Sequence, residues 1–276
     1  MSKHVSFSAS LVLTSSLAFG AASALAEGPN DASREGCKNL PSWSALHAAL
    51  VAAQAQSNGF LHNQMWGTIV DRDGVVCAVA FTGADRGEQW LGSRVISAQK
   101  ANTGNEFSLP AGGSGAFPAG LALSTANLYS AVQPGGSLYG LQASNPVSTE
   151  VAYSGDPENY GRENDGMVGE RIGGINVFGG GLPLYNAGHQ LLGGLGVSGD
   201  TSCADHNVAY RARSILKLDW VPAGVSGDPN RLDTIVYDIV PQTGQMPGVS
   251  PSGWGHPRCF PADVAASGTL PVNNTK

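Results

Sequence analysis

Short apolar segments along this chain switch between helical and strand spacing, which predicts a mixed α and β fold. Residues 43–57 carry apolar side chains at helical spacing behind Ser42, a residue type that favours a helix start. Two runs rich in β-branched residues, 65–70 and 75–81, are separated by the sequence Asp-Arg-Asp-Gly and predict a β-hairpin. Residues 89–106 return to helical spacing, with small side chains on one face. The N-terminal part of the chain therefore predicts a helix, a hairpin and a second helix.

The rest of the chain predicts three more strands and another long helix. The expected strands are 173–178, 182–185 and 190–197, and the expected helix is 201–216. Around them we expect a flexible loop over 108–120, a helical segment over 124–132, a short strand over 138–141, a polar surface excursion over 145–169 and one strand over 234–237. This order predicts the α+β class: an antiparallel sheet of about five strands flanked by helices, with an irregular C-terminal extension rich in proline and glycine.

Residues 1–26 have the features of a secretory signal peptide. They contain Lys3 in a short basic start, an apolar run over 7–24, and the sequence Ala-Leu-Ala directly before Glu27. We expect cleavage near Ala26 and a location in the periplasm or outside the cell. The apolar run is interrupted by serine and glycine, and no second hydrophobic span follows it. We therefore expect a protein that is not embedded in a membrane.

The chain after the signal is long enough for one large domain. We expect a domain over 27–216 and an extension over 217–276 that packs on it. The formal net charge is −6 and no segment gathers basic residues, which argues against nucleic acid as a partner. Charged residues are only 13% of the chain while glycines number 38, which indicates a folded, loop-rich chain rather than a disordered one.

The four cysteines all lie after the predicted signal. An even number of cysteines in an exported chain favours disulfides over metal binding or catalysis. Of the three possible pairings we favour Cys37 with Cys77 and Cys203 with Cys259, because each would tie a terminal extension to a core element. The sequence Cys-Ala-Asp-His at 203–206 lacks the second cysteine of a c-type haem attachment motif, so covalent haem is not expected.

Two glycine-rich segments, 177–183 and 191–200, frame a tight turn and open onto the last long helix. Glycines at this density indicate backbone at positive φ or a close approach by another group. We expect a ligand site at these turns, formed by Gly180, Gly181, Ser198 and Gly199. The first amides of the helix, with Asp200 or Ser202 as the cap, would offer an anion site for a carboxylate or propionate. A well-capped helix without a ligand explains the same pattern.

The second glycine-rich segment has the spacing of one binding motif and comes close to one catalytic motif. Gly194, Gly196 and Gly199 have the spacing of the dinucleotide-binding fingerprint. However, the preceding strand is the last of its sheet, and no second βαβ unit follows it. The sequence Gly-Val-Ser-Gly-Asp at 196–200 is one residue off the nucleophile elbow of hydrolases. We predict neither a dinucleotide site nor a hydrolase elbow there.

Lys100 and Thr103 lie among small residues on the second predicted helix, which indicates that another element packs closely against it. In one interpretation Thr103 bonds a carbonyl of its own helix within a tight helix–sheet contact. In the other, the small residues line a pocket into which Lys100 or Thr103 points. The histidines after the signal show no metal-binding spacing, and we expect them to be surface or hydrogen-bonded residues.

Five of these segments resemble, in order, those of the GlcG/HbpS family of haem-binding proteins, also catalogued as a domain of unknown function. They are Ile-Val-Asp-Arg-Asp-Gly at 69–74, Phe-Thr-Gly-Ala-Asp at 81–85, Ala-Gln-Lys-Ala-Asn-Thr at 98–103, Gly-Gly-Gly-Leu-Pro at 179–183, and 192–199 followed by Asp205. No single segment is specific, whereas five in order are a strong match over about 43–216. The resemblance implies an antiparallel sheet with helices on both sides and assembly into a homo-oligomer.

The resemblance also implies a function, namely an exported protein that binds haem for sensing, scavenging or breakdown. The family assigns a threonine as an iron contact, and its motif position matches Thr103. Lys100 would then pair a haem propionate, and His62 and His206 are the further candidates for iron. Apolar walls would come from residues such as Phe178 and Leu182.

Two other functions fit the same residues. An enzyme or binding protein for a small hydroxy or oxo acid would use the same anion pocket, with Lys100 or Asp205 transferring a proton. The third possible function, after haem binding and the small-acid protein, is that of a purely structural or sensory oligomer. The loop at 108–120, the excursion at 145–169 and the cysteine-linked tail are additions to the family core that would cover or reshape the ligand site. Whether the protein is an enzyme stays open at this point.

Overall fold

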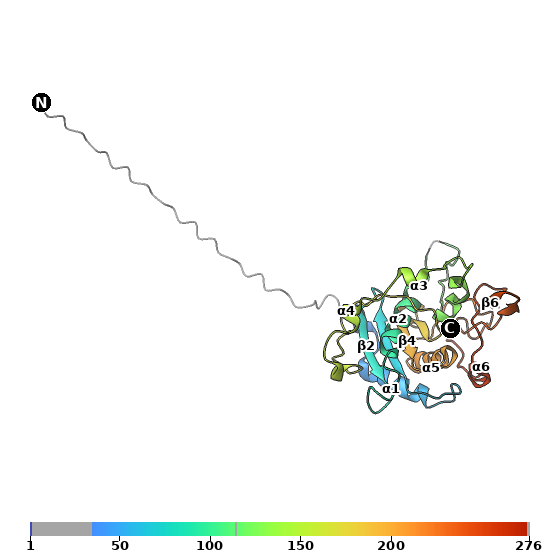
Figure 1. Ribbon diagram of the computed structural model, residues 1–276, viewed down its shortest axis with the longest axis horizontal. Coiled ribbons are helices and arrows are strands. Elements are labelled where there is room, and N and C mark those ends of the chain that lie inside the picture. The colour runs from blue at the N-terminus through green and yellow to red at the C-terminus, as the bar shows by residue number, and fades with distance from the viewer. Residues whose placement is uncertain (2–34, 114, 275–276) are drawn as a thin grey trace.

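The structure is a computed structural model that describes Met1 and residues 35–113 and 115–274 (Figure 1). Apart from Met1, the predicted signal peptide and its cleavage site lie outside the described residues. Within the described part of the chain, no helix is long and apolar enough to cross a membrane.

One antiparallel sheet of four strands forms the centre of the fold, in the order β2-β1-β4-β3. The strands are β1 (Trp66–Asp71), β2 (Val76–Phe81), β3 (Gly181–Tyr185) and β4 (Leu191–Ser198). β1 and β2 form the predicted hairpin, and Gly74 in its turn has a φ of 76°, which favours glycine. The predicted α+β class with an antiparallel sheet is therefore confirmed, with four strands in place of about five.

Helices cover both faces of this sheet. On one face α1 (Trp43–Gln54) and α5 (Ser202–Ile215) pack over a core that includes Leu46, Ile69 and Val208. On the other face α2 (Ser93–Glu106) packs over Val70 and its neighbours. Ser42 caps α1 as predicted, with its hydroxyl accepting from the amide of Ala45 at 3.3 Å.

The glycines of β4 allow α2 to lie directly on the sheet. A Cβ atom added at Gly196 would overlap the carbonyl oxygen of Ser97, and one at Gly194 would overlap that of Ala101. The helix backbone therefore occupies the space that side chains on β4 would need. At these two positions the dense glycines serve close packing and leave no room for a ligand.

The predicted strand at 173–178 is wrong. Its amides bond to side chains instead of a neighbouring strand: Asn176 donates to Thr103 Oγ1 at 3.0 Å, and Val177 donates to Gln142 Oε1 at 3.2 Å. Gly173 and Gly174 also have φ values of 62° and 83°, which break an extended run. This segment is the missing fifth strand.

Other local predictions were also wrong. The segment 138–141 is not a strand and leads into α3 (Leu141–Ser144), and 234–237 has only an isolated bridge from Val236 to Gly255. The predicted helical segment at 124–132 is a pair of short 3₁₀ helices. The remaining elements are α4 (Thr149–Ala152), β5 (Val240–Gln242), β6 (Gln245–Val249), α6 (Pro261–Ser267) and the 3₁₀ turns Gly36–Asn39, Thr125–Leu128, Ser130–Val132 and Pro157–Asn159.

The polar excursion at 145–169 covers part of the sheet instead of extending into solvent. Its residues Ala152 and Met167 are fully buried against the face that carries α2. Asp165 anchors it, since its carboxylate accepts from Arg94 Nε of α2 at 2.8 Å and from the amide of Gly161 at 2.7 Å. The excursion is therefore a fixed wall of the domain.

Two disulfides join Cys37 to Cys77 and Cys203 to Cys259, which is the pairing favoured from the sequence. The second bond attaches the C-terminal extension to the start of α5. Asp263 of α6 adds to this attachment by accepting from Thr201 Oγ1 at 2.6 Å and from the amide of Phe60 at 2.7 Å. In Figure 1 the extension, with β6 and α6, lies on the side of the molecule opposite α4 and β2.

Candidate functional site

Five of the residues named from the sequence meet in a buried cluster between α2 and α5, which we call the Lys–Asp centre (Lys100, Gly180, Gly181, Ser198 and Asp205). Lys100 Nζ lies 2.7 Å from Asp205 Oδ2 and 3.1 Å from the carbonyl oxygen of Val197. Ser198 Oγ is at 3.5 Å from the same ammonium nitrogen. Lys100 and Asp205 are 1% and 2% exposed, so the ion pair is closed to solvent.

Burial dominates the electrostatics of the Lys–Asp centre. It lowers the pKa of Lys100 and raises that of Asp205 to about 6, while the attraction between the two groups opposes both changes. Asp205 Oδ1 also accepts from the amide of Asp200 at 2.8 Å. Both charged groups thus have hydrogen-bond partners in addition to each other, as a buried ion pair requires.

The glycines at this centre lie against neighbouring groups of the chain. Gly180 has a φ of 115°, and a Cβ there would lie 3.2 Å from Lys100 Nζ. A Cβ at Gly181 would overlap the carbonyl oxygen of Lys100, and one at Gly199 would overlap that of Gln64. At each of these three glycines the chain itself fills the space that a side chain would take.

Thr103 and His206, the candidates for iron, are both fully buried. Thr103 Oγ1 donates to the carbonyl oxygen of Gln99 at 2.7 Å and accepts from Asn176, as the tight-contact interpretation predicts. His206 has no hydrogen-bond partner at either ring nitrogen within the described chain, and its ring lies 5.6 Å from that of Tyr210. Burial, reinforced by the charge of Arg213, lowers the pKa of His206 well below its usual value.

The remaining predicted contacts are dispersed. His62 is exposed in the loop before β1, Phe178 is 46% exposed, and Leu182 is buried in the core. The α5 cap is Thr201, which accepts from the amide of Ala204 at 3.2 Å, so both predicted caps were wrong. That amide is therefore already bonded within the chain.

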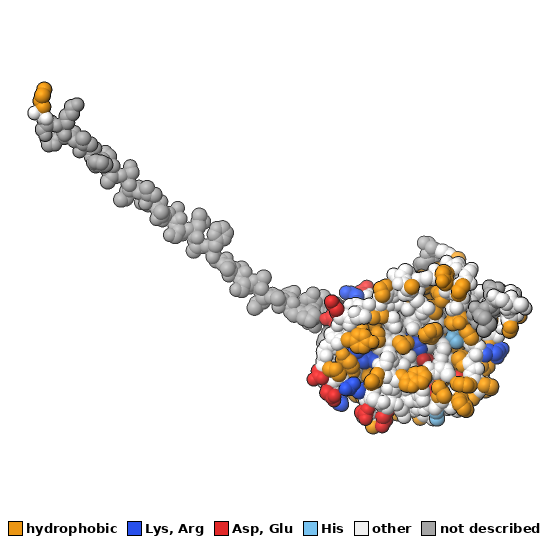
Figure 2. All heavy atoms as spheres, in the orientation of Figure 1, with side chains coloured by type: hydrophobic (Ala, Val, Ile, Leu, Met, Phe, Trp, Pro, Cys, Tyr) orange, Lys and Arg blue, Asp and Glu red, His pale blue; other side chains and the backbone are white. Residues whose placement is uncertain are grey.

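A different part of the molecule is open to a ligand. Two cavities of about 470 and 340 Å³ share Phe81 and Arg162. We call them together the aromatic groove. The side chains most relevant to binding are Trp43, His47, Phe81, Arg86, Tyr160 and Arg162. They come from α1, the end of β2, the loop after it and the excursion. In Figure 2 acidic and basic side chains gather along the edge where α4 and β2 lie in Figure 1.

The aromatic side chains of the groove are fixed by their neighbours. Trp43 stacks on His47 with ring centres 5.1 Å apart and planes within 6°, and its indole nitrogen donates to the carbonyl oxygen of Gly161 at 2.9 Å. Gly161 has a φ of 80°, and a Cβ there would overlap the ring of Phe81. The groove is therefore built by close contact between α1, β2 and the excursion.

Sequence reasoning missed the groove because it treated His47 as an ordinary surface histidine. The available signal was the spacing of Trp43 and His47, which are four residues apart on one helix and therefore share a face. The wall formed by Tyr160 and Arg162 had no such signal, since it depends on the fold of the excursion.

One group of potential metal ligands occurs among the described residues. It consists of Cys37, Asp71 and Cys77, whose ligand atoms lie within 4.8 Å of one another. The two sulfurs are joined in a disulfide, so they are not available as thiolate ligands.

Comparisons with known proteins bear on residues 42–214, which match the family described as "Haem degrading protein HbpS-like". Among solved structures, the Klebsiella pneumoniae protein ORFY of the DUF336 family is 24% identical over 64% of this chain and 90% of that chain, with a TM-score of 0.40. A PduOC:heme complex is 24% identical over 62% and 89% of the two chains, also with a TM-score of 0.40. No curated protein is significantly similar to this chain. The family match covers well over half of the chain, and the protein therefore belongs to the HbpS-like family.

Proposed function

We propose that this protein binds haem in the aromatic groove. The observation that carries the proposal is that a partly exposed imidazole, His47, shares an open cavity with Trp43, Phe81 and Arg162, and that this cavity adjoins the one lined by Arg86 and Tyr160. The larger cavity, at about 470 Å³, is within the usual size of cofactor sites. The family description and the haem carried by the PduOC structure support the ligand class.

The groove offers each kind of contact that haem requires. His47 would ligate iron, because imidazole is the commonest axial ligand of protein haem. Phe81 and Tyr160 would contact the apolar ring. Arg162 would pair a propionate, because a guanidinium matches a carboxylate with two hydrogen bonds, and Arg86 would pair the other in exchange for its exposed contact with Glu158 at 3.5 Å. Bound haem would supply a redox-active iron, while the protein contributes binding and orientation.

The Lys–Asp centre fits haem less well than the groove does. Thr103 and Lys100 are buried and already bonded to protein groups, so either would have to give up its partners to contact a ligand. The same burial disfavours a small-acid enzyme that uses Lys100 or Asp205 for proton transfer, because neither side chain is open to a substrate.

A hemin titration of the disulfide-bonded protein tests this proposal. We expect a saturable Soret shift, with affinity reduced roughly a hundredfold in His47→Ala because the axial ligand is lost. His62→Ala is the matched control, since His62 is an exposed histidine outside the groove, and it should bind like the parent. Thr103→Ala and His206→Ala test whether haem binds instead near the Lys–Asp centre. Loss of binding in either of these, with His47→Ala unchanged, would place haem at the site expected from the sequence instead.

Export and assembly belong to the same proposal. Two disulfides support an oxidising compartment, in agreement with the predicted signal peptide. We propose the periplasm or the exterior of the cell, which fractionation of an expressing cell would test. The proposed homo-oligomer would be tested by light scattering with and without hemin, where a hemin-dependent change in mass would favour sensing.

A further inference from the structure

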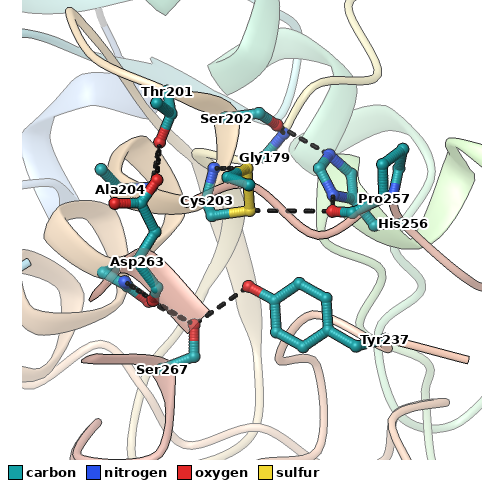
Figure 3. Close-up of a disulfide and its surroundings, with 12 residues drawn as sticks. Gly179, Thr201, Ser202, Cys203, Ala204, Tyr237, His256, Pro257, Asp263 and Ser267 are labelled. Atoms are coloured by element: carbon teal, nitrogen blue, oxygen red, sulfur yellow. Dashed lines mark hydrogen bonds between the residues drawn. A yellow bond between two sulfur atoms is a disulfide. The ribbon is translucent and has the colours of Figure 1, made fainter. Parts of the chain in front are cut away.

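Ser202 and His256 form a close pair at the start of α5, on the extension side of the molecule. Ser202 Oγ lies 2.7 Å from His256 Nε2, as the dashed line in Figure 3 shows. His256 Nδ1 lies 2.7 Å from the carbonyl oxygen of Pro257. Because a carbonyl oxygen can only accept, Nδ1 carries the proton and Nε2 is left to accept the hydrogen of the serine hydroxyl.

This arrangement has the three parts of an activated nucleophile: a hydroxyl, a base within hydrogen-bond distance, and a third group that orients the base. The ring of Tyr129, 5.1 Å from that of His256, further restricts the imidazole. Burial lowers the pKa of His256 to about 4, partly opposed by its hydrogen bond to Pro257, so the imidazole is neutral at neutral pH.

The surroundings of Ser202 favour a developing negative charge. Ser202 is the first residue of the fourteen-residue helix α5, where the backbone amides give a partial positive charge. The amide of Gly179 donates to Ser202 Oγ at 2.7 Å. Ser202 is partly exposed while His256 is buried, as expected for a nucleophile that meets a substrate and a base that does not need to.

The second disulfide holds the pair together. Cys203 follows Ser202 directly, and its partner Cys259 lies three residues after His256, so one covalent bond fixes both segments (Figure 3). His256 also lines a cavity of about 210 Å³ with Tyr237, Ile239 and Arg258. That cavity has an apolar wall and one positive charge, and it adjoins the pair through His256.

We propose that Ser202 and His256 form a second, haem-independent site that hydrolyses small carboxylic esters. Ser202 Oγ bonds to the ester carbonyl carbon as its proton moves to His256 Nε2. The bond from that carbon to the alcohol oxygen then breaks, and the alcohol leaves with the proton from Nε2. Water attacks the acyl-serine and gives a proton to Nε2. That proton returns to Ser202 Oγ as the carboxylic acid leaves.

Two readouts on the disulfide-bonded protein without haem test this site. With p-nitrophenyl acetate we expect saturable hydrolysis that falls at least a hundredfold in Ser202→Ala and in His256→Gln, as loss of a nucleophile or its base predicts. With an alkyl fluorophosphonate we expect one covalent adduct, mapped by mass spectrometry to Ser202. The adduct requires no variant, so a folding defect in either substitution does not affect it.

Ser130→Ala is the matched control. Ser130 Oγ donates to the carbonyl oxygen of Gly255 at 2.6 Å, so it is a neighbouring serine bonded beside His256 but without an imidazole partner. It should retain hydrolysis and labelling. Absence of an adduct on Ser202, or equal hydrolysis in all variants, would overturn the proposal. Hemin binding in the groove should be unaffected by Ser202→Ala, which separates this outcome from a failure of the haem proposal.

Discussion

The Lys–Asp centre and the aromatic groove both lie within the residues that match the family, yet of the two only the groove is open. In the centre, Lys100 and Asp205 are bonded to each other and to the backbone, and glycines bring the chain too close for a ligand to enter. In the groove, aromatic and basic side chains line a cavity whose walls come from separate segments. The difference teaches that a dense glycine motif can mark tight packing, while an open cavity forms where side chains leave the surface unfilled.

The largest expected effect comes from breaking the close packing itself. Gly196→Ala should reduce the free energy of unfolding by about 4 kcal/mol or more, because the new Cβ would overlap the helix carbonyl of Ser97. Urea denaturation measures it. Gly92→Ala is the control, since nothing lies within 4 Å of a Cβ there, and it should change stability by less than about 0.5 kcal/mol. Equal stabilities for the two variants would contradict the packing role of the β4 glycines.

The next effect comes from leaving one charge of the Lys–Asp centre unpaired. Lys100→Met should reduce the free energy of unfolding by about 3 kcal/mol, because Asp205 then stays buried without its partner. The double variant Lys100→Met with Asp205→Leu should recover much of that loss. Thermal and urea unfolding give the values. Hemin affinity measured on the folded fraction should be unchanged, and a parallel loss of hemin affinity would move the ligand site to this centre.

The smallest effect is expected at the rim of the groove. Arg162→Ala should weaken hemin binding about fivefold, or about 1 kcal/mol, because one propionate partner at an exposed position is lost. Stability should be nearly unchanged. Arg258→Ala, an arginine on the extension, is a suitable control and should bind hemin like the parent. Identical affinity in both variants would leave Arg162 without a role in binding.

The sequence predicted the regular parts of the fold because their signals are local. The hairpin at 65–81 has a turn sequence and β-branched strands, and α1 has a capping serine, so both formed as expected. The strand at 173–178 failed because its apolar residues follow two glycines at positive φ and bond to Thr103 and Gln142, which are distant in the sequence. The local sequence of a segment does not show which distant residues its amides will bond to.

The sequence predicted which residues lie together at the candidate site better than it predicted what they do there. Lys100, Gly180, Gly181 and Ser198 do lie together, as their places in the motifs suggested. Whether these residues leave room for a ligand depends on the distances between their atoms, and the number of glycines in a motif does not give those distances. The pair of Ser202 and His256 depends on how the extension returns to α5, and the two residues are 54 positions apart.

The order of the sheet has a kinetic consequence. β1 pairs with β2 through a short turn but with β4 from the far end of the domain, where Trp66 lies opposite Ser198. The hairpin can form as soon as its residues are synthesised, whereas its inner edge has no partner until β4 arrives. An unpaired edge of this kind is a template for pairing with another chain. The growing polypeptide therefore carries an aggregation hazard at β1, and β4 removes that hazard only when nearly the whole domain has been made.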